Sequence, residues 1–219
     1  TYMAAAKICI RLSKVNKAIT YLEAATELDK TNRDTWWSLT LQYEKGELED
    51  KYIEALNKML EFEPNNDDVH VRLAKKYRAK QEMVNALRHY DLVAGMYRKG
   101  GDAFLLSKAV RKQTIKDQES LLNDLKIGRG FTGGPGEVVG TVQYRSNKMF
   151  QQRVRVNDEL SGAVSLLIET NAKSRVSGVT VKDDQLQDDW VVANIIGNFK
   201  RAIIWGGAKR YNIELVYEK

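Results

Sequence analysis

Apolar and small residues recur at helical spacing along the first hundred residues, and the pattern returns after 34 positions. One register consists of Ala18, Leu22 and Ala25, which shift by 34 to Tyr52, Leu56 and Met59 and again to Ala86, Tyr90 and Val93. A second register consists of Trp36, Leu39, Thr40 and Tyr43, which shift by 34 to His70, Leu73, Ala74 and Tyr77. Each register needs its own helix, so the sequence predicts three stacked helix hairpins over residues 1–100, with Trp36 and Tyr43 buried between neighbours.

This pattern resembles the tetratricopeptide repeat, whose first helix carries Trp, Leu, a small residue and Tyr and whose second helix carries Ala and an aromatic residue before a Pro. Residues 33–66 match best, through Trp36, Leu39, Tyr43 and the closing Pro64, although Thr40 replaces the usual small residue. The resemblance implies an all-α solenoid that binds a partner on its concave side.

The repeat pattern stops at Gly100 and Gly101, and Asp102 is a suitable N-cap for a further helix. Residues 102–125 then keep a roughly helical spacing of apolar residues with a polar middle. A solenoid needs a terminal element with a polar outer face. We therefore expect one long capping helix, which would complete a first domain at residues 1–126.

The stretch GRGFTGGPG, residues 128–136, fits the letters of a nucleotide-binding loop, but its context is wrong. Such a loop follows a strand and precedes a helix, because the phosphate sits on the helix N-terminus. Here a predicted helix precedes the glycines, and GEVVGTVQY (136–144) after them is strand-like. We expect residues 127–136 to be a glycine-rich linker to a second domain at 137–219.

In the second domain the apolar period changes toward two. GAVSLLIET (162–170) and RVSGVTVKD (175–183) alternate like adjacent strands, DDWVVANIIGNFKRAII (188–204) is an amphipathic helix, and RYNIELVYE (210–218) is a last strand. Residues 147–160 fit either a helix or a strand. The predicted fold class is therefore α+β, an all-α repeat solenoid followed by a small strand–strand–helix–strand domain.

This second domain resembles the C-terminal domain of the TonB family, in the branch found in gliding-motility and other envelope machines of bacteria. The match lies within 147–219 and consists of Gly162 opening the first strand, a hairpin ending in VSGVTV, the acidic crossover DDQLQDD, a helix and a final strand. Met149 and Asn194 stand where that branch often has cysteines, so its disulfide is absent, and Trp205 with two glycines replaces its Pro. The resemblance implies a module that pairs strands with, or docks onto, an envelope partner.

The charge balance is mildly basic, with 35 Lys and Arg against 29 Asp and Glu. Residues 1–127 carry 22 basic and 19 acidic side chains and residues 128–219 carry 13 and 10, so each part has a net charge of +3. Nucleic-acid-binding proteins concentrate their charge on one face or segment, so a nucleic-acid partner is a poor fit. No apolar run reaches the length of a membrane-spanning helix.

The sequence holds no arrangement of residues that predicts catalysis. Cys9 is the only cysteine and His70 and His89 are the only histidines, which leaves little for metal or nucleophilic chemistry. We interpret His70 as a packed helix residue, His89 as solvated and Cys9 as a small buried apolar residue. Paired aspartates such as Asp67 and Asp68 stand at helix starts, where capping explains them. We expect no enzyme activity, no cofactor, no metal and no small-molecule substrate.

The candidate site is the concave side of the solenoid, which the resemblance places on the first helix of each hairpin. The implied partner-binding residues are Lys7, Arg11, Trp37, Leu41, Lys45, Arg72, Lys75 and Arg78. Arg72, Lys75 and Arg78 are three apart and so lie roughly along one helix face. They predict a basic groove, interrupted by Trp37 and Leu41, that suits a protein or peptide with acidic residues beside an apolar anchor. The alternative is a charged face that is merely solvated.

Two functions fit these patterns. The first is a scaffold in a bacterial cell-envelope assembly for motility, secretion or transport, in the periplasm or at the envelope, where the repeats hold one partner and the C-terminal module engages another component. The second is a cytoplasmic adaptor whose α+β domain is unrelated to that family and associates with RNA. Because the chain opens at Thr1 within helical patterning, we expect it to be a piece of a longer protein.

Overall fold

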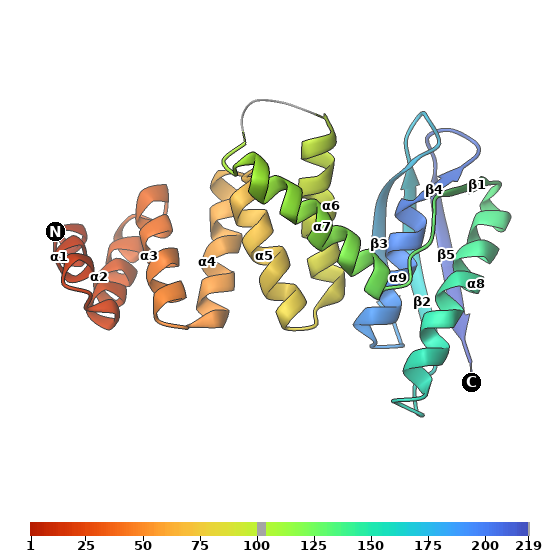
Figure 1. Cartoon of the computed structure of the whole chain (residues 1–219), viewed down its shortest axis with the longest axis horizontal. Coiled ribbons are helices and arrows are strands. Elements are labelled where there is room, and N and C mark those ends of the chain that lie inside the picture. Colours follow the sequence, from red (N-terminus) through yellow and green to blue (C-terminus); the bar gives the residue numbers. More distant parts are fainter. Residues whose placement is uncertain (100–103, 219) are drawn as a thin grey trace.

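The structure is a computed structural model that describes residues 1–99 and 104–218. Helices α1 to α7 form one part of an elongated molecule, and two helices with the strands form the other part (Figure 1). The chain therefore belongs to the α+β class, as its sequence predicted. Among the described residues, no helix combines the length and the apolar character needed to cross a membrane.

The first six helices pair as hairpins that recur with the period of the sequence pattern. Their first helices are α1 (Tyr2–Arg11), α3 (Arg33–Lys45) and α5 (Asp67–Ala79), and their second helices are α2 (Val15–Leu28), α4 (Glu49–Phe62) and α6 (Met83–Lys99). The turn inside each hairpin places Ser13, Glu47 and Gln81 in the left-handed region, with φ of 54°, 56° and 62°. The sequence period thus extends to the backbone conformation of the turns.

Side-chain contacts between hairpins follow the same period. Tyr43 Oη donates to Glu23 at 2.8 Å, and Asn57 Nδ2 donates to Tyr77 Oη at 3.2 Å, which joins the equivalent two positions of the next hairpins. Tyr43 is 7% exposed and buried as expected. Trp36 is only half-buried, because its indole N–H reaches outward to the carbonyl of Lys30 at 3.0 Å.

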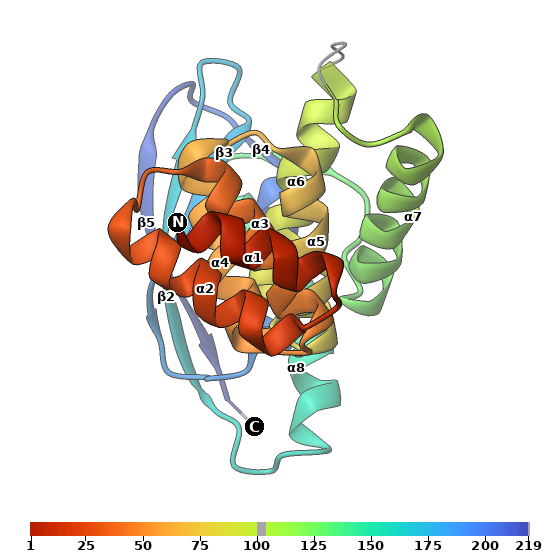
Figure 2. The same ribbon diagram turned by 90° about the vertical axis from the view of Figure 1, so that its left-hand side faces the viewer.

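Helix α7 (Lys108–Asp124) is shorter than the expected helix at 102–125. Ser107 is its N-cap, and the carboxylate of Asp67 accepts hydrogen bonds from the backbone N–H groups of Leu105 and Leu106, which holds these two residues outside the helix. The expected breaks at Gly100 and Gly101 and the cap at Asp102 lie outside the described residues. Seen from the N-terminal end of the molecule, α7 lies to one side of the stacked hairpins (Figure 2).

Residues 127–136 are not a free linker, which corrects the sequence-based prediction. Within them, β1 (Phe131–Gly133) pairs in parallel with β4 (Ala202–Ile204), and Ile127 is buried in the core. The expected helix at 188–204 accordingly ends earlier, as α9 (Asp189–Lys200), because its last residues form β4. This pairing joins two segments that lie far apart in the sequence, which local patterns do not reveal.

The strand-like segment 136–144 is in fact the first half of α8 (Pro135–Val154). Proline at the first helical position suits a helix start, and the Glu137 carboxylate accepts a hydrogen bond from the N–H of Gly134 at 2.9 Å. These capping interactions outweigh the strand preference of the valines. The same helix settles the ambiguous segment 147–160, which is helical as far as Val154.

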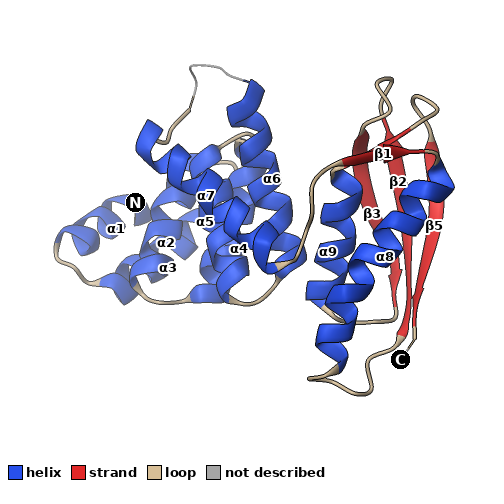
Figure 3. Cartoon of the chain, turned by 45° about the vertical axis from the view of Figure 1, so that its right-hand side comes forward, coloured by secondary structure: helices blue, strands red, loops and turns tan. Residues whose placement is uncertain are grey.

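The main sheet contains β2 (Gly162–Thr170), β3 (Val176–Asp184) and β5 (Arg210–Tyr217), antiparallel in the order β3-β2-β5. Alternate residues of β2 are buried, and α8 and α9 cover that face of the sheet (Figure 3). The elements that form this sheet and its cover follow the predicted order of strand, strand, helix and strand, with the short β4 added between α9 and β5.

One hydrophobic core runs from the third hairpin into the C-terminal part. Its buried members include Leu87 on α6, Leu121 on α7, Ile127, and Ile195 and Phe199 on α9. Gly197 of α9 faces this junction, where a β-carbon would lie 2.1 Å from Cδ1 of Ile127. A side chain at this position would have to displace the end of the Ile127 side chain, so the glycine allows α9 to pack closely against the segment that follows α7.

Candidate functional site

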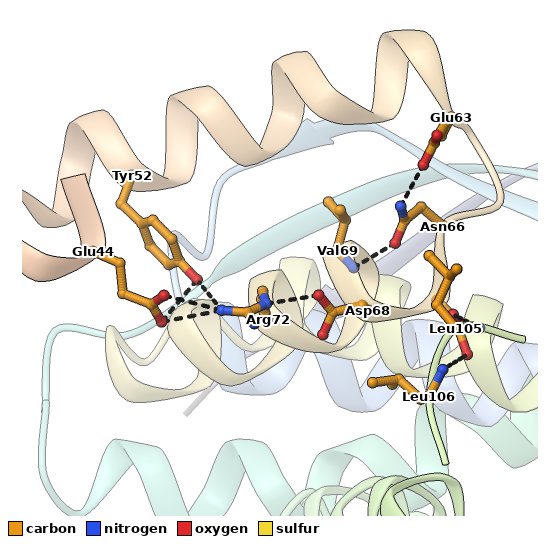
Figure 4. Close-up of polar contacts among 10 residues, drawn as sticks. Glu44, Tyr52, Glu63, Asn66, Asp68, Val69, Arg72, Leu105 and Leu106 are labelled. Carbon is orange, nitrogen blue, oxygen red and sulfur yellow. Dashed lines mark hydrogen bonds and ion pairs between the residues drawn. The ribbon is translucent and has the colours of Figure 1, made fainter. Parts of the chain in front are cut away.

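Arg72 lies at the centre of a polar network that joins α3, α4 and α5 (Figure 4). Its Nε donates to Asp68 Oδ2 at 2.9 Å, and its NH1 group donates to both carboxylate oxygens of Glu44 at 3.1 Å. The same NH1 group donates to Tyr52 Oη at 3.1 Å. The guanidinium carbon also lies 5.9 Å from the centre of the Trp37 ring. One side chain thus fixes the relative positions of two neighbouring hairpins.

The electrostatics of this network keep Arg72 charged and paired. Burial alone would lower the pKa of Arg72, but the hydrogen bonds with Tyr52 and Asp68 outweigh it and raise that pKa above its usual range. For Tyr52, burial acts in the other direction and raises the pKa of the phenol, although the nearby Arg72 guanidinium lowers it. Two carboxylates, from Glu44 and Asp68, neutralise the arginine, so its charge contributes little to attraction at long range.

A hollow of about 420 Å³ lies beside this network. It is lined by Arg33, Trp37, Asn66, Asp68, Leu105 and Leu106. Leu105 is 66% exposed and stands at the hollow as an apolar side chain open to solvent. The hollow therefore combines an indole, two leucines and polar groups, which is a composition suited to an amphipathic ligand segment.

Asp67 fixes the wall of the hollow that residues 104–106 provide. This carboxylate is 2% exposed and accepts hydrogen bonds from Leu105 N–H at 3.0 Å, Leu106 N–H at 3.3 Å and Tyr97 Oη at 3.2 Å. Capping of α5 falls instead to Asn66, which accepts from Val69 N–H at 3.0 Å. The expectation that Asp67 and Asp68 serve only as helix-start residues was wrong, because one anchors a distant loop and the other pairs with Arg72.

The sequence-predicted partner-binding residues have three different environments. Lys7, Arg11, Lys45 and Lys75 are exposed and form no ion pair within the described residues; Trp37 and Leu41 are half-buried; Arg72 and Arg78 are ion-paired. Arg78 donates to Asp124 of α7 at 2.5 Å and to Ser120 Oγ at 3.1 Å, so it holds α7 against α5.

The predicted stripe of Arg72, Lys75 and Arg78 is therefore not a row of free cations. Their spacing did place them on one helix, and Asp68 pairs with Arg72 from one turn earlier on that helix. The other acidic partners, Glu44 of α3 and Asp124 of α7, lie far away in the sequence, so the spacing could not show them. Sequence reasoning also missed Arg33, Asn66, Leu105 and Leu106 at the hollow. Of these, only Asn66 had a usable signal, because it repeats the helix-start position of Asn32, which accepts from Thr35 N–H at 3.0 Å.

The two histidines form a buried pair between α5 and α6. His89 is 7% exposed, so the prediction that it is solvated was wrong. The Nδ1 atoms of His70 and His89 are 2.9 Å apart, and His70 Nε2 lies 2.9 Å from the carbonyl of Pro64. A carbonyl only accepts, so His70 carries its proton on Nε2, and His89 Nδ1–H must donate to His70 Nδ1. Sequence reasoning failed because α6 buries His89 together with its neighbour Tyr90.

The histidine pair is an internal contact that stays neutral at neutral pH. Burial lowers the pKa of both imidazoles, that of His89 to about 4, and Tyr77 stacks on His89 with ring centres 5.6 Å apart. In the described part of the chain, no three His, Cys, Asp or Glu side chains gather as a metal site.

Compared with models of known protein families and with curated proteins, the chain matches none of them.

Proposed function

We propose that this protein is a non-enzymatic scaffold whose helix hairpins are tetratricopeptide-type repeats and bind a protein segment at the hollow beside Trp37. The observation that carries the proposal is the hollow itself, about 420 Å³ between α3, the start of α5 and Leu105–Leu106. Its indole and leucines are accessible, while its charged groups are already paired. Such a site gains binding free energy from an apolar anchor of the partner.

The exposed cations indicate how the bound segment would be oriented on the repeats. Lys45 lies eight residues beyond Trp37 on α3, which corresponds to about 12 Å along a helix. Lys75 lies one turn beyond Arg72 on α5, and neither lysine forms an ion pair within residues 1–99 and 104–218. A bound segment would place its apolar side chain in the hollow and acidic residues toward Lys45 and Lys75.

The repeat assignment is supported by the regular recurrence of helices, turns and hairpin contacts with the period of the sequence. The assignment of the C-terminal part as a TonB-type module is supported by its strand, strand, helix, strand order and by the helices on one sheet face. We therefore propose that the protein acts in a bacterial cell-envelope assembly, with the repeats and the C-terminal module binding different components.

The proposal is tested with a random peptide library selected on the immobilised full chain. Selected peptides should share acidic residues beside one large apolar residue, and titration should show that Trp37→Ala weakens binding mainly through faster dissociation. Lys45→Glu with Lys75→Glu should slow association and reduce its salt dependence. Lys14→Glu with Lys17→Glu is the matched control, since these exposed lysines lie outside α3 and α5. Peptides that bind Trp37→Ala as tightly as the unmodified chain would rule out the hollow as the site.

A further inference from the structure

Three connecting segments, called loops below, meet at one end of the C-terminal part: residues 128–134, which include the short β1, the hairpin turn 171–175, and residues 205–210, which end at the first residue of β5. Trp205 N–H donates to the carbonyl of Gly133 at 2.9 Å, and Gly207 N–H donates to Ser174 Oγ at 3.0 Å. Together these bonds hold all three loops as one surface. The hairpin loop and the loop before β5 protrude beyond the sheet in two views (Figures 1 and 3).

This end of the molecule is positively charged. The three loops contain five exposed cations and no aspartate or glutamate: Arg129, Lys173, Arg175, Lys209 and Arg210. Only Arg210 has an ion pair within the described residues, with Glu169 at 2.8 Å. Two carboxylates adjoin this end: Glu169, which pairs with Arg210, and Glu137, which accepts from the N–H of Gly134 at 2.9 Å. Asp183, Asp184 and Asp188 lie at the opposite end of β3, so five cations face two carboxylates here and the end carries a net positive charge.

An exposed indole stands among these cations. Trp205 is 60% exposed, although its Nε1–H donates to Thr132 Oγ1 at 2.7 Å and is satisfied within the protein. The bond fixes the ring while leaving its apolar surface in solvent. The residues that follow, Gly206, Gly207 and Ala208, add no side chain large enough to cover it. We call Trp205 and the five cations the basic end.

We propose that the basic end docks onto the surface of an anionic lipid bilayer. Cations within about a Debye length of anionic headgroups are attracted to them, and Trp is favoured at the level of the headgroups. The shape of this end favours a bilayer over a single-stranded nucleic acid. Nucleic-acid sites track the strand along a groove and stack several bases on successive aromatic residues, whereas the basic end protrudes and offers one exposed indole.

The test measures binding of the full chain to phosphatidylcholine vesicles with and without phosphatidylglycerol by co-sedimentation. Binding should require the anionic lipid and weaken as salt is raised. Each cation near such a surface contributes about five-fold in affinity, so Lys173→Glu, Arg175→Glu and Lys209→Glu together should weaken binding by about 100-fold or more. Equal binding to neutral vesicles would overturn the proposal.

One control variant separates the basic end from net charge and from the repeat groove. Lys7→Glu, Arg11→Glu and Lys45→Glu change the net charge equally but lie on α1 and α3, so this variant should bind vesicles like the unmodified chain. An equal loss in both triple variants would mean that overall charge drives binding and would overturn the proposal. Because the groove variant is expected to leave vesicle binding unchanged, a failure of the lipid proposal would not count against the proposed peptide site.

Fluorescence reports directly on Trp205. Lipids with brominated acyl chains should quench the tryptophan emission of the full chain, and Trp205→Phe should remove that quenching, because Trp36, Trp37 and Trp190 lie elsewhere. Unchanged quenching in Trp205→Phe would contradict insertion of this indole. If a single-stranded oligonucleotide displaces the chain from vesicles and loses affinity in the same basic-end variant, the surface binds nucleic acid and the lipid proposal fails. Circular dichroism and thermal unfolding verify that each variant is folded.

Discussion

The backbone N–H of Val84 donates a 2.9 Å hydrogen bond to Oδ2 of Asp189, across 105 residues of sequence. Val84 lies in the first turn of α6 and Asp189 begins α9, so a carboxylate of the C-terminal part caps a helix of the third hairpin. Burial raises the pKa of Asp189 against the effect of this bond and of the Met83 N–H. The junction therefore contains a partly buried polar contact in addition to its apolar core.

Asp189→Ala should destabilise the junction, because it leaves the N–H of Val84, in the first turn of α6, without an acceptor. We expect the free energy of unfolding to fall by about 1–2 kcal/mol, measured by chemical denaturation. Asp189→Asn keeps one acceptor oxygen and removes a buried charge, so it should stay closer to the unmodified chain. Asp183→Ala, on an exposed residue of β3, is the control. Equal effects of Asp183→Ala and Asp189→Ala would show that the cap does not stabilise the fold.

Gly197→Ala should destabilise the same junction by crowding. The added β-carbon would lie 2.1 Å from Cδ1 of Ile127, and relief of such overlap typically costs about 1–3 kcal/mol. Ile127→Val removes this methyl carbon, so Gly197→Ala should cost less in that background, which a double-mutant cycle measures.

Gly140 provides the matched control for this substitution. It lies within α8, and an added β-carbon there meets nothing within 4 Å. Gly140→Ala should therefore stabilise the helix by about 0.5–1 kcal/mol. If both alanine variants change stability in the same direction, the close approach of α9 to Ile127 is not as described.

Stability should fall in mild acid because of the buried histidines. The pKa of His89 is about 4 in the folded chain against an ordinary value of 6.5, so the unfolded chain takes up a proton first as the pH falls. Above about pH 6.5, His89 adds nothing to the pH dependence of stability. Between about pH 6.5 and 4, it should lower the free energy of unfolding by an amount on the order of 3 kcal/mol. Arg88 also lowers the pKa of His89, while Asp67 acts to raise that of His70.

His89→Asn isolates this effect. The Asn amide can donate to His70 Nδ1 in place of His89 Nδ1–H, but it does not titrate. Denaturation at pH 7.5 measures the loss of packing alone, and the fall from pH 7.5 to pH 4.5 should be smaller in the variant than in the unmodified chain. The same fall in both would exclude His89 as a source of the acid sensitivity.

The hairpins were predictable from sequence because their packing is local and repeats. The same packing positions recur after one period, as Trp36 and Tyr43 show. They pack the helices of one hairpin against each other and against the next hairpin. The strand–strand–helix–strand order was also readable, because β2 alternates and the apolar residues of α9 follow a helical spacing. The expectation that this helix has a polar face was wrong, because α9 is buried on all sides from Val191 to Phe199. In both cases the period of apolar residues carries the information.

The errors arose where distant segments or capping decide the structure. β1 becomes a strand only because Ala202–Ile204 lies beside it. The valines of α8 favour a strand locally, although Pro135 and Glu137 were a readable helix-start signal. At the candidate site, Trp37 was identified from its repeat position, whereas Leu105 reaches the hollow through a bond to Asp67, far away in the sequence.

The predicted basic stripe can be divided into structural and free cations by single substitutions. Arg72→Glu should destabilise the fold, because it removes charged hydrogen bonds and places a third carboxylate beside Glu44 and Asp68. Each such bond contributes about 1.5–3 kcal/mol, and partial exposure of Arg72 reduces this, so we expect a loss of about 2 kcal/mol. Lys75→Glu, one turn away and exposed, should change stability by less than about 0.5 kcal/mol.

Arg78→Glu should resemble Arg72→Glu for a different reason, because it repels Asp124 and releases the contact of α7 with α5. The denaturant midpoint of Lys75→Glu should therefore be higher than the midpoints of both arginine variants. Far-UV circular dichroism checks the helix content of each variant. Only Lys75→Glu can then be used to test peptide binding, since its fold is intact. Equal stability of all three variants would show that the arginines are as free as the lysine and would restore the continuous basic groove.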